Sequence, residues 1–80
     1  MNYFVYLIQS IDQPQQRYVG FTSNLEARLE KHNEGGSPYT SKYKPWELIA
    51  GFIFPKKETS LKFEKYLKSH SGRAFAKKHF

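Results

Sequence analysis

The segment Arg17–His32 constrains the fold of this chain more than any other, because it reads as a strand that runs directly into a helix. Its first half holds aromatic and β-branched residues on both sides of Gly20, a composition that favours a strand with a point where a backbone or a ligand comes close. Ser23 followed three residues later by Glu26 is a capping-box pattern, which predicts the start of a helix. The chain therefore combines at least one strand with a helix that follows it immediately.

This helix is expected to span about Asn24–Asn33 and to end at the glycine pair that follows. At 100° per residue, Leu25 and Leu29 lie on one face of the helix, and His32 falls about 20° from Leu25. Arg28 precedes His32 by four residues and so lies beside it. A titratable side chain and a cation thus border the apolar face, and we interpret both as candidate functional residues.

The rest of the chain predicts two more strands and two more helices. The segment Tyr3–Ser10 is apolar at both alternating sets of positions, as expected for a central strand that is buried on both faces. The other expected segments are a turn at Asp12–Gln16, a strand at Arg17–Thr22, an irregular stretch at Ser37–Trp46, a strand at Glu47–Phe54, a helix from Lys57 or Glu58 to His70 that Ser71 and Gly72 break, and a short helix over Arg73–Lys78. This order, β-β-α-β-α-α, predicts an α+β fold in which three mainly antiparallel strands are flanked by helices.

The length and composition predict one small domain over residues 1–80. The chain has no cysteine, which excludes disulfides and thiolate zinc sites, and seven Phe, six Tyr and one Trp supply core material instead. The longest apolar run, Tyr3–Ile8, has six residues and is too short to span a membrane; no basic region precedes it as in a signal peptide. We therefore expect a soluble cytoplasmic protein without a membrane segment.

The positive charge lies at one end of the chain. The net charge is +6, and residues 56–80 carry eight Lys or Arg against only Glu58 and Glu64. A one-sided positive field suggests a polyanionic partner, with nucleic acid first and a membrane surface second. A lysine-rich face that only keeps the protein soluble has the same pattern, so charge alone does not decide between the two.

Glu64 is the acidic residue with the most suggestive position. On the helical wheel it lies on the seam between the packing face and a row of three lysines, Lys62, Lys65 and Lys68. A carboxylate at such a seam can hold Mg²⁺ that also contacts substrate phosphate. The alternative is a Glu64–Lys68 ion pair worth about 0.2–0.5 kcal/mol, and the helix pattern alone favours this simpler interpretation.

A second basic region lies within Ser37–Trp46, where Lys42 and Lys44 alternate with aromatic residues such as Tyr43. Interleaved basic and aromatic side chains are typical of surfaces that contact phosphates and stack on bases. A surface connection with aromatic lids over the core has the same composition, and both interpretations stay open.

Together these residues resemble the GIY-YIG nuclease superfamily, and the resemblance covers nearly the whole chain. The matching positions are Phe4-Val5-Tyr6, where the family often has Gly-Ile-Tyr, then Tyr18-Val19-Gly20, then Arg28 at the helix arginine, His32 where members carry His or Tyr, and Glu64 at the metal-binding glutamate. Each tripeptide match is weak by itself. The complete set, in order and on the expected elements, is specific.

The resemblance implies hydrolysis of phosphodiester bonds in DNA with one divalent metal ion, Mg²⁺ or Mn²⁺, bound by Glu64. It implies that Arg28 stabilises negative charge that develops on the phosphate. Tyr6 and Tyr18 would hold or deprotonate the attacking water, with His32 assisting. Of the two we favour Tyr6 as the base, because a central strand holds its side chain more rigidly.

The resemblance also implies that DNA is the partner. The protein would cut DNA of a particular structure during repair or recombination. Contacts with nucleic acid are expected at Gly20, where the DNA backbone would come close, and at the lysines Lys42, Lys44, Lys62, Lys65 and Lys68. A protein partner would supply DNA specificity, since 80 residues leave no room for the DNA-binding domain that most active relatives carry.

Three departures from the family pattern leave alternatives open. Phe4 replaces the first glycine of the motif, Phe21 stands where several nucleases have a lysine, and no polar residue clearly matches the one that some members use after the glutamate. Without that lysine, the pattern predicts one phosphate contact fewer than in those nucleases. The alternatives are a nucleic-acid-binding module with little or no turnover, and a protein-interaction domain whose basic end meets an acidic partner.

Overall fold

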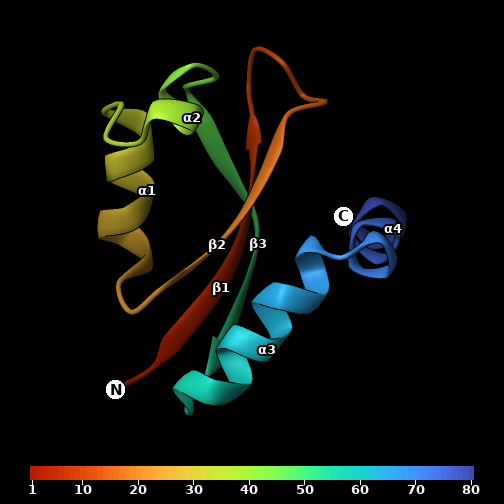
Figure 1. Ribbon diagram of the computed structural model, residues 1–80. Coiled ribbons are helices and arrows are strands. Elements are labelled where there is room, and N and C mark those ends of the chain that lie inside the picture. The colour runs from red at the N-terminus through yellow and green to blue at the C-terminus, as the bar shows by residue number, and fades with distance from the viewer.

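Figure 1 shows a computed structural model that describes all residues from 1 to 80. The elements are β1 (Tyr3–Ser10), β2 (Arg17–Thr22), α1 (Leu25–Asn33), α2 (Pro38–Ser41), β3 (Trp46–Phe54), α3 (Lys57–Lys68) and α4 (His70–His79). The three strands form one antiparallel sheet in the order β2-β1-β3. This confirms the predicted α+β fold and the predicted central strand. None of the helices is long and apolar enough to span a membrane.

Side chains on both faces of β1 are buried, which shows that the sheet is covered on both sides of its central strand. Tyr6 and Ile8 form a core cluster with Trp46, and Leu25 and Leu29 of α1 pack against it. On the other face, Phe52 of β3 contacts Phe63 of α3, with ring centroids 4.7 Å apart. Helices α1 and α3 therefore lie on opposite sides of the sheet, as Figure 1 shows.

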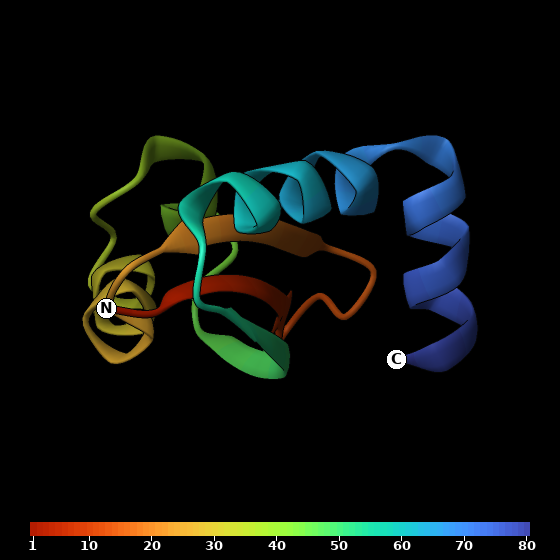
Figure 2. The same ribbon diagram turned by 90° about the horizontal axis from the view of Figure 1, so that it is seen from below.

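Helix α4 turns away from the sheet at the end of α3. Figure 2, seen from below, shows α3 running along the sheet and α4 crossing at its far end, with the C-terminus near the loop that joins β1 to β2. Tyr66 and Phe75 bring the two helices together, with ring centroids 6.3 Å apart. The two C-terminal helices thus form a corner beside β2 and the β1–β2 loop.

The start of α1 differs from the predicted capping box. The N-cap is Asn24, whose Oδ1 accepts a hydrogen bond from the Ala27 N–H at 3.1 Å, whereas Ser23 lies one residue before the cap. Thr22 Oγ1 accepts from the Asn24 N–H at 3.0 Å and sets the turn into the helix. The chain therefore enters α1 one residue later than predicted. The predicted end is confirmed, because Gly35 follows the helix with a positive φ of 82°.

The segment Ser37–Trp46 is more regular than predicted. It contains the single-turn helix α2, which begins at Pro38. Proline suits the first helical turn, because the N–H it lacks would have no partner inside the helix. Trp46 belongs to β3, which starts one residue before the predicted Glu47.

The break between the last two helices lies at Ser69, so the predicted break at Ser71 and Gly72 was wrong. Ser69 is extended, with φ −77° and ψ 167°, and its side chain accepts a hydrogen bond from the Gly72 N–H at 3.2 Å. Gly72 lies inside α4, where a Cβ would overlap the backbone of Tyr66 and Leu67. The glycine therefore permits the close corner and does not end α3, and α4 is longer than predicted.

Candidate active site

The register of β1 and β2 brings the two predicted tyrosines onto one face of the sheet. Tyr6 lies opposite Gly20, and Ile8 lies opposite Tyr18, so the two tyrosines are diagonal neighbours. Their ring centroids are 6.4 Å apart. A Cβ on Gly20 would overlap the ring and hydroxyl of Tyr6. The group that comes close to Gly20 is therefore the Tyr6 ring, and the predicted contact between Gly20 and DNA backbone is not needed to explain the glycine.

A buried chain of hydrogen bonds starts at Tyr6 and joins four elements. The Tyr6 hydroxyl and His32 Nε2 are 2.7 Å apart, and His32 Nδ1 and Thr40 Oγ1 are 2.8 Å apart. The Trp46 indole N–H donates to the Thr40 carbonyl oxygen at 2.7 Å. Tyr6 is only 1% exposed and His32 only 3%. This chain fixes the imidazole at both of its nitrogens.

Both titratable members of this chain are uncharged near neutral pH. Burial raises the pKa of Tyr6 to about 12, although the positive charge of Arg28 acts in the opposite direction. Burial also lowers the pKa of His32 below its ordinary value of 6.5, and the positive charges of Arg28 and Lys31 lower it further. A neutral imidazole donates from one nitrogen and accepts at the other, so His32 donates one of its two hydrogen bonds and accepts the other.

Arg28 lies where the helical wheel of α1 placed it. It is half-buried, and its guanidinium donates a hydrogen bond to the Phe21 carbonyl oxygen at 3.3 Å. Its charge acts on the pKa of both Tyr6 and His32. No carboxylate forms an ion pair with it. Arg28 is therefore a cation held at the site with its charge not neutralised.

Glu64 lies on α3, and its charge acts on Tyr6. Its side chain is only 20% exposed, and Glu64 Oε2 lies 3.1 Å from Lys68 Nζ, which confirms the ion pair that the helix pattern favoured. The negative charge of Glu64 also contributes to the raised pKa of Tyr6, although it is not the largest cause. The carboxylate thus acts both on a lysine and on the buried tyrosine.

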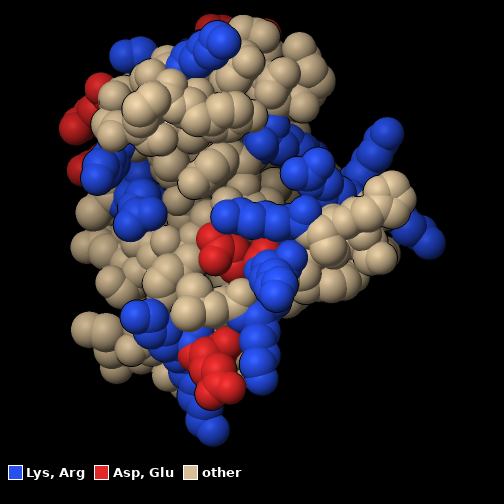
Figure 3. All heavy atoms as spheres, in the orientation of Figure 1, with Lys and Arg blue, Asp and Glu red and all other residues tan.

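The lysines that were predicted to bind DNA are exposed but differ in their contacts. Lys62 pairs with Glu58 at 3.4 Å, Lys68 pairs with Glu64, and Lys65 has no acidic partner. Figure 3 shows acidic side chains over α3 bordered by basic ones. Lys42 and Lys44 lie in the α2–β3 connection, where Lys42 Nζ is 5.9 Å from the Tyr43 ring centroid. Their contacts with nucleic acid stay predictions.

A divalent metal fits this donor set only if the substrate helps to hold it. No group of three or more His, Cys, Asp or Glu side chains converges anywhere in the chain. Mg²⁺ is commonly bound by one or two carboxylates together with water and substrate phosphates. Glu64, a partly buried carboxylate whose charge acts on Tyr6, meets that requirement as a single protein ligand.

Sequence reasoning missed Thr40 and Trp46. Thr40 lies in the segment that was predicted to be irregular, and its hydroxyl bonds a histidine eight residues earlier. No periodicity marks such a contact, because it depends on how α2 folds back onto α1. Asn33 makes a similar link, since its side chain exchanges hydrogen bonds with the backbone of Trp46. These links hold the α2 segment against the site.

Comparisons with known proteins identify relatives of this chain. A family model described as "GIY-YIG catalytic domain" matches residues 2–78. The chain is 41% identical over 69 residues to "Structure-specific endonuclease subunit SLX1" of Debaryomyces hansenii, a match that covers 78% of this chain and 20% of that protein. It is 35% identical over 74 residues to "UPF0213 protein BH0048" of Halalkalibacterium halodurans, covering 91% of this chain and 77% of that protein.

The solution NMR structure of the UPF0213 protein BH0048 from Bacillus halodurans is similar to the whole fold. It has a TM-score of 0.57 and 33% sequence identity, and the match covers 96% of this chain and 81% of that one. By contrast, the chain spans about a fifth of the length of the SLX1 protein that it matches.

Proposed function

Because this chain belongs to the GIY-YIG family, we propose that it is an endonuclease that hydrolyses phosphodiester bonds in DNA of a particular structure, such as a branch, with the help of one divalent metal ion. The observation that supports this best is that Tyr6 and His32 are hydrogen-bonded to each other and that the positive charge of Arg28 acts on both. The similarity to a structure-specific endonuclease subunit supports the choice of substrate.

Arg28 binds the phosphate that is cleaved. Its guanidinium is a planar fork that can donate to two phosphate oxygens, and its charge is not neutralised by a carboxylate. As water attacks, negative charge builds up on the phosphoryl oxygens. A cation that α1 already holds in place stabilises that charge without having to reorganise.

Tyr6 and His32 together take the proton of the attacking water. With a pKa of about 12, Tyr6 is protonated at neutral pH and is no base by itself. His32 is neutral, and its Nε2 accepts from the Tyr6 hydroxyl when its Nδ1–H donates to Thr40. Tyr6 then passes its own proton to His32 as it takes one from water. This changes the role first assigned to Tyr6, from base to relay.

Glu64 would hold the metal ion, which supplies charge stabilisation for the leaving oxygen when it is bound. Glu64 Oε2 lies 3.1 Å from Lys68 Nζ. The carboxylate must therefore give up part of its contact with Lys68 when it binds the metal. Lys68 would be released toward the substrate phosphates. Tyr18, half-buried beside both rings of the pair, orients the water or the phosphate.

A protein partner is proposed to supply part of the DNA specificity. The SLX1 relative is named as a subunit, and this chain corresponds to about a fifth of that protein. Cleavage of DNA by its structure is a step of repair and recombination, and we place the activity there.

Incubation of the protein with branched, nicked and single-stranded DNA, with Mg²⁺ or Mn²⁺ and with chelator, tests this function. We expect cleavage that needs the metal and that Glu64→Gln abolishes, because glutamine keeps the helix but loses the charge. Glu58→Gln is the matched control, since it breaks the other i, i+4 ion pair of α3. Lys68→Gln separates the loss of the Glu64–Lys68 pair from the loss of the metal ligand.

Cleavage by Glu64→Gln at the wild-type rate would remove Glu64 from the mechanism. If the wild type binds DNA but cuts none of these substrates with either metal, the chain is a nucleic-acid-binding module on the same fold. Loss of cleavage in both Glu64→Gln and Glu58→Gln would assign the effect to helix α3 and not to a metal ligand.

A further inference from the structure

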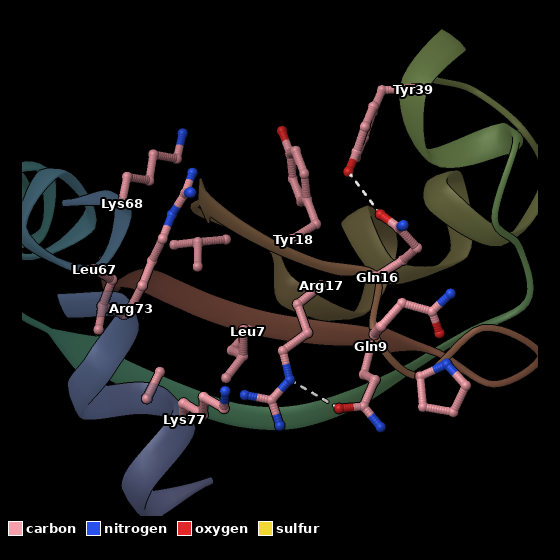
Figure 4. A pocket seen from close by; sticks show the side chains of 14 residues that line it. Leu7, Gln9, Gln16, Arg17, Tyr18, Tyr39, Leu67, Lys68, Arg73 and Lys77 are labelled. Atoms are coloured by element: carbon pink, nitrogen blue, oxygen red, sulfur yellow. Dashed lines mark hydrogen bonds between the residues drawn. The ribbon is translucent and has the colours of Figure 1, made fainter. Parts of the chain in front are cut away.

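A groove of about 910 Å³ opens beside the site, between β2, the β1–β2 loop and the corner of α3 and α4. Figure 4 shows Lys68, Arg73 and Lys77 on the helical side, and Tyr18, Tyr39 and Gln16 on the opposite side. Tyr18 lines this groove, whereas the buried Tyr6 does not. The groove is of the size that holds a drug-sized ligand.

One wall of this groove presents aromatic surface to solvent. Tyr39 is 48% exposed, and its ring centroid lies 6.0 Å from that of Tyr18. Its hydroxyl donates a hydrogen bond to Gln16 Oε1 at 3.5 Å, which ties α2 to the β1–β2 loop. A large ring left open at the edge of a polar groove is a surface on which a nucleobase stacks, whatever its sequence.

The other wall is basic and contains no carboxylate. Its cations are Arg17, Lys68, Arg73 and Lys77. The Arg17 guanidinium already donates to the Gln9 side chain and to the Phe80 carbonyl oxygen. Arg73 and Lys77 form no ion pair, and their spacing of four residues places them on one side of α4. Two free cations thus face the groove.

Tyr18 connects the groove to the catalytic residues. Its ring centroid lies 5.2 Å from that of His32 and 6.0 Å from that of Tyr39. A strand whose base stacks on Tyr39 would therefore lie next to Tyr18, which contacts the ring of His32. Bases inside a duplex are already stacked on one another, so an exposed ring favours unpaired DNA.

We propose that this groove binds an unpaired stretch of DNA next to the cleaved phosphate, with a base stacked on Tyr39 and phosphates contacting Arg73 and Lys77. This proposal rests on the proposed function in one respect, because it takes the substrate to be DNA with a single-stranded arm next to the cleaved bond. The site adds Tyr39, Arg73 and Lys77 to the residues that contact nucleic acid.

Binding of a fluorescent oligothymidylate, measured by anisotropy in chelator so that nothing is cleaved, tests the groove. Tyr39→Leu should weaken binding by about 10-fold, whereas Tyr39→Phe should keep it within about twofold, because only the ring is needed for stacking. Arg73→Gln with Lys77→Gln should reduce the slope of log K against log [salt] by about 1.4. The matched double variant, Lys57→Gln with Lys78→Gln, removes the same charge outside the groove. It should retain most of the wild-type salt slope.

Equal binding by wild type, Tyr39→Leu and the Arg73/Lys77 variant would overturn the groove proposal. A salt slope that falls equally in the two double variants would also overturn it, since only net charge would then matter. Loss of duplex binding as large as the loss of oligothymidylate binding would contradict the preference for unpaired DNA. If these variants behave as expected but no DNA is cut with metal, the groove stands and the nuclease proposal fails.

Discussion

Replacing Thr40 by valine tests whether the buried hydrogen bonds hold His32 for catalysis. Valine has nearly the shape of threonine but lacks the hydroxyl, so His32 Nδ1 loses its partner while its other nitrogen still faces Tyr6. Water cannot replace that partner easily, since neither Thr40 nor His32 is appreciably exposed. The change therefore leaves a buried polar nitrogen unpaired and little else altered.

The expected cost of Thr40→Val is about 1–3 kcal/mol of unfolding free energy, the usual penalty for a buried polar group without a partner. For a domain of this size, each kcal/mol corresponds to about 4–8 °C in Tm. Single-turnover cleavage should fall by up to about 10²-fold, because the imidazole is no longer held at both ends. Thr40→Ser keeps the hydroxyl and loses only a methyl group, so it should retain most of the rate.

Urea unfolding and single-turnover cleavage, measured on both variants, check this reasoning. A Thr40→Val protein with wild-type stability and rate would show that the hydroxyl does not hold His32. Equal losses of rate in the serine and valine variants would assign the effect to packing of the methyl group.

Three further outcomes follow from the same site. Gly20→Ala should destabilise the fold by about 1–3 kcal/mol in urea unfolding, because its Cβ overlaps the Tyr6 ring; wild-type stability would contradict the packing described here. Arg28→Lys should lose most of the cleavage rate although it keeps the charge, because an ammonium lacks the planar fork, and a near wild-type rate would show that charge alone suffices. Since the pKa of His32 is lowered by burial, the unfolded chain binds more protons below pH 6.5, so stability should fall as the pH drops through that range. His32→Gln should lose this part of the pH dependence, and identical pH profiles of the two proteins would contradict it.

Local patterns were enough to locate most of the fold. Tyr3–Ser10 and Arg17–Thr22 have the predicted bounds, because side-chain alternation and β-branched content act within a few residues. The same holds for the face of α1, where the helical period places Arg28 beside a buried His32. Which residues face the core depends on the spacing of apolar residues within one strand or helix, so it can be predicted from the sequence.

Only the folded chain decides which of these residues touch. The Tyr6 ring fills the space that Gly20 leaves on the neighbouring strand, and the Tyr6 hydroxyl meets a histidine 26 residues away. Thr40 has no pattern of its own and acquires its role when α2 folds back onto His32. The raised pKa of Tyr6 follows from burial, which depends on everything packed around it. Contacts between residues distant in sequence leave no periodic trace, so the hydrogen bonds of Tyr6, His32 and Thr40 and the groove exist only at the level of tertiary structure.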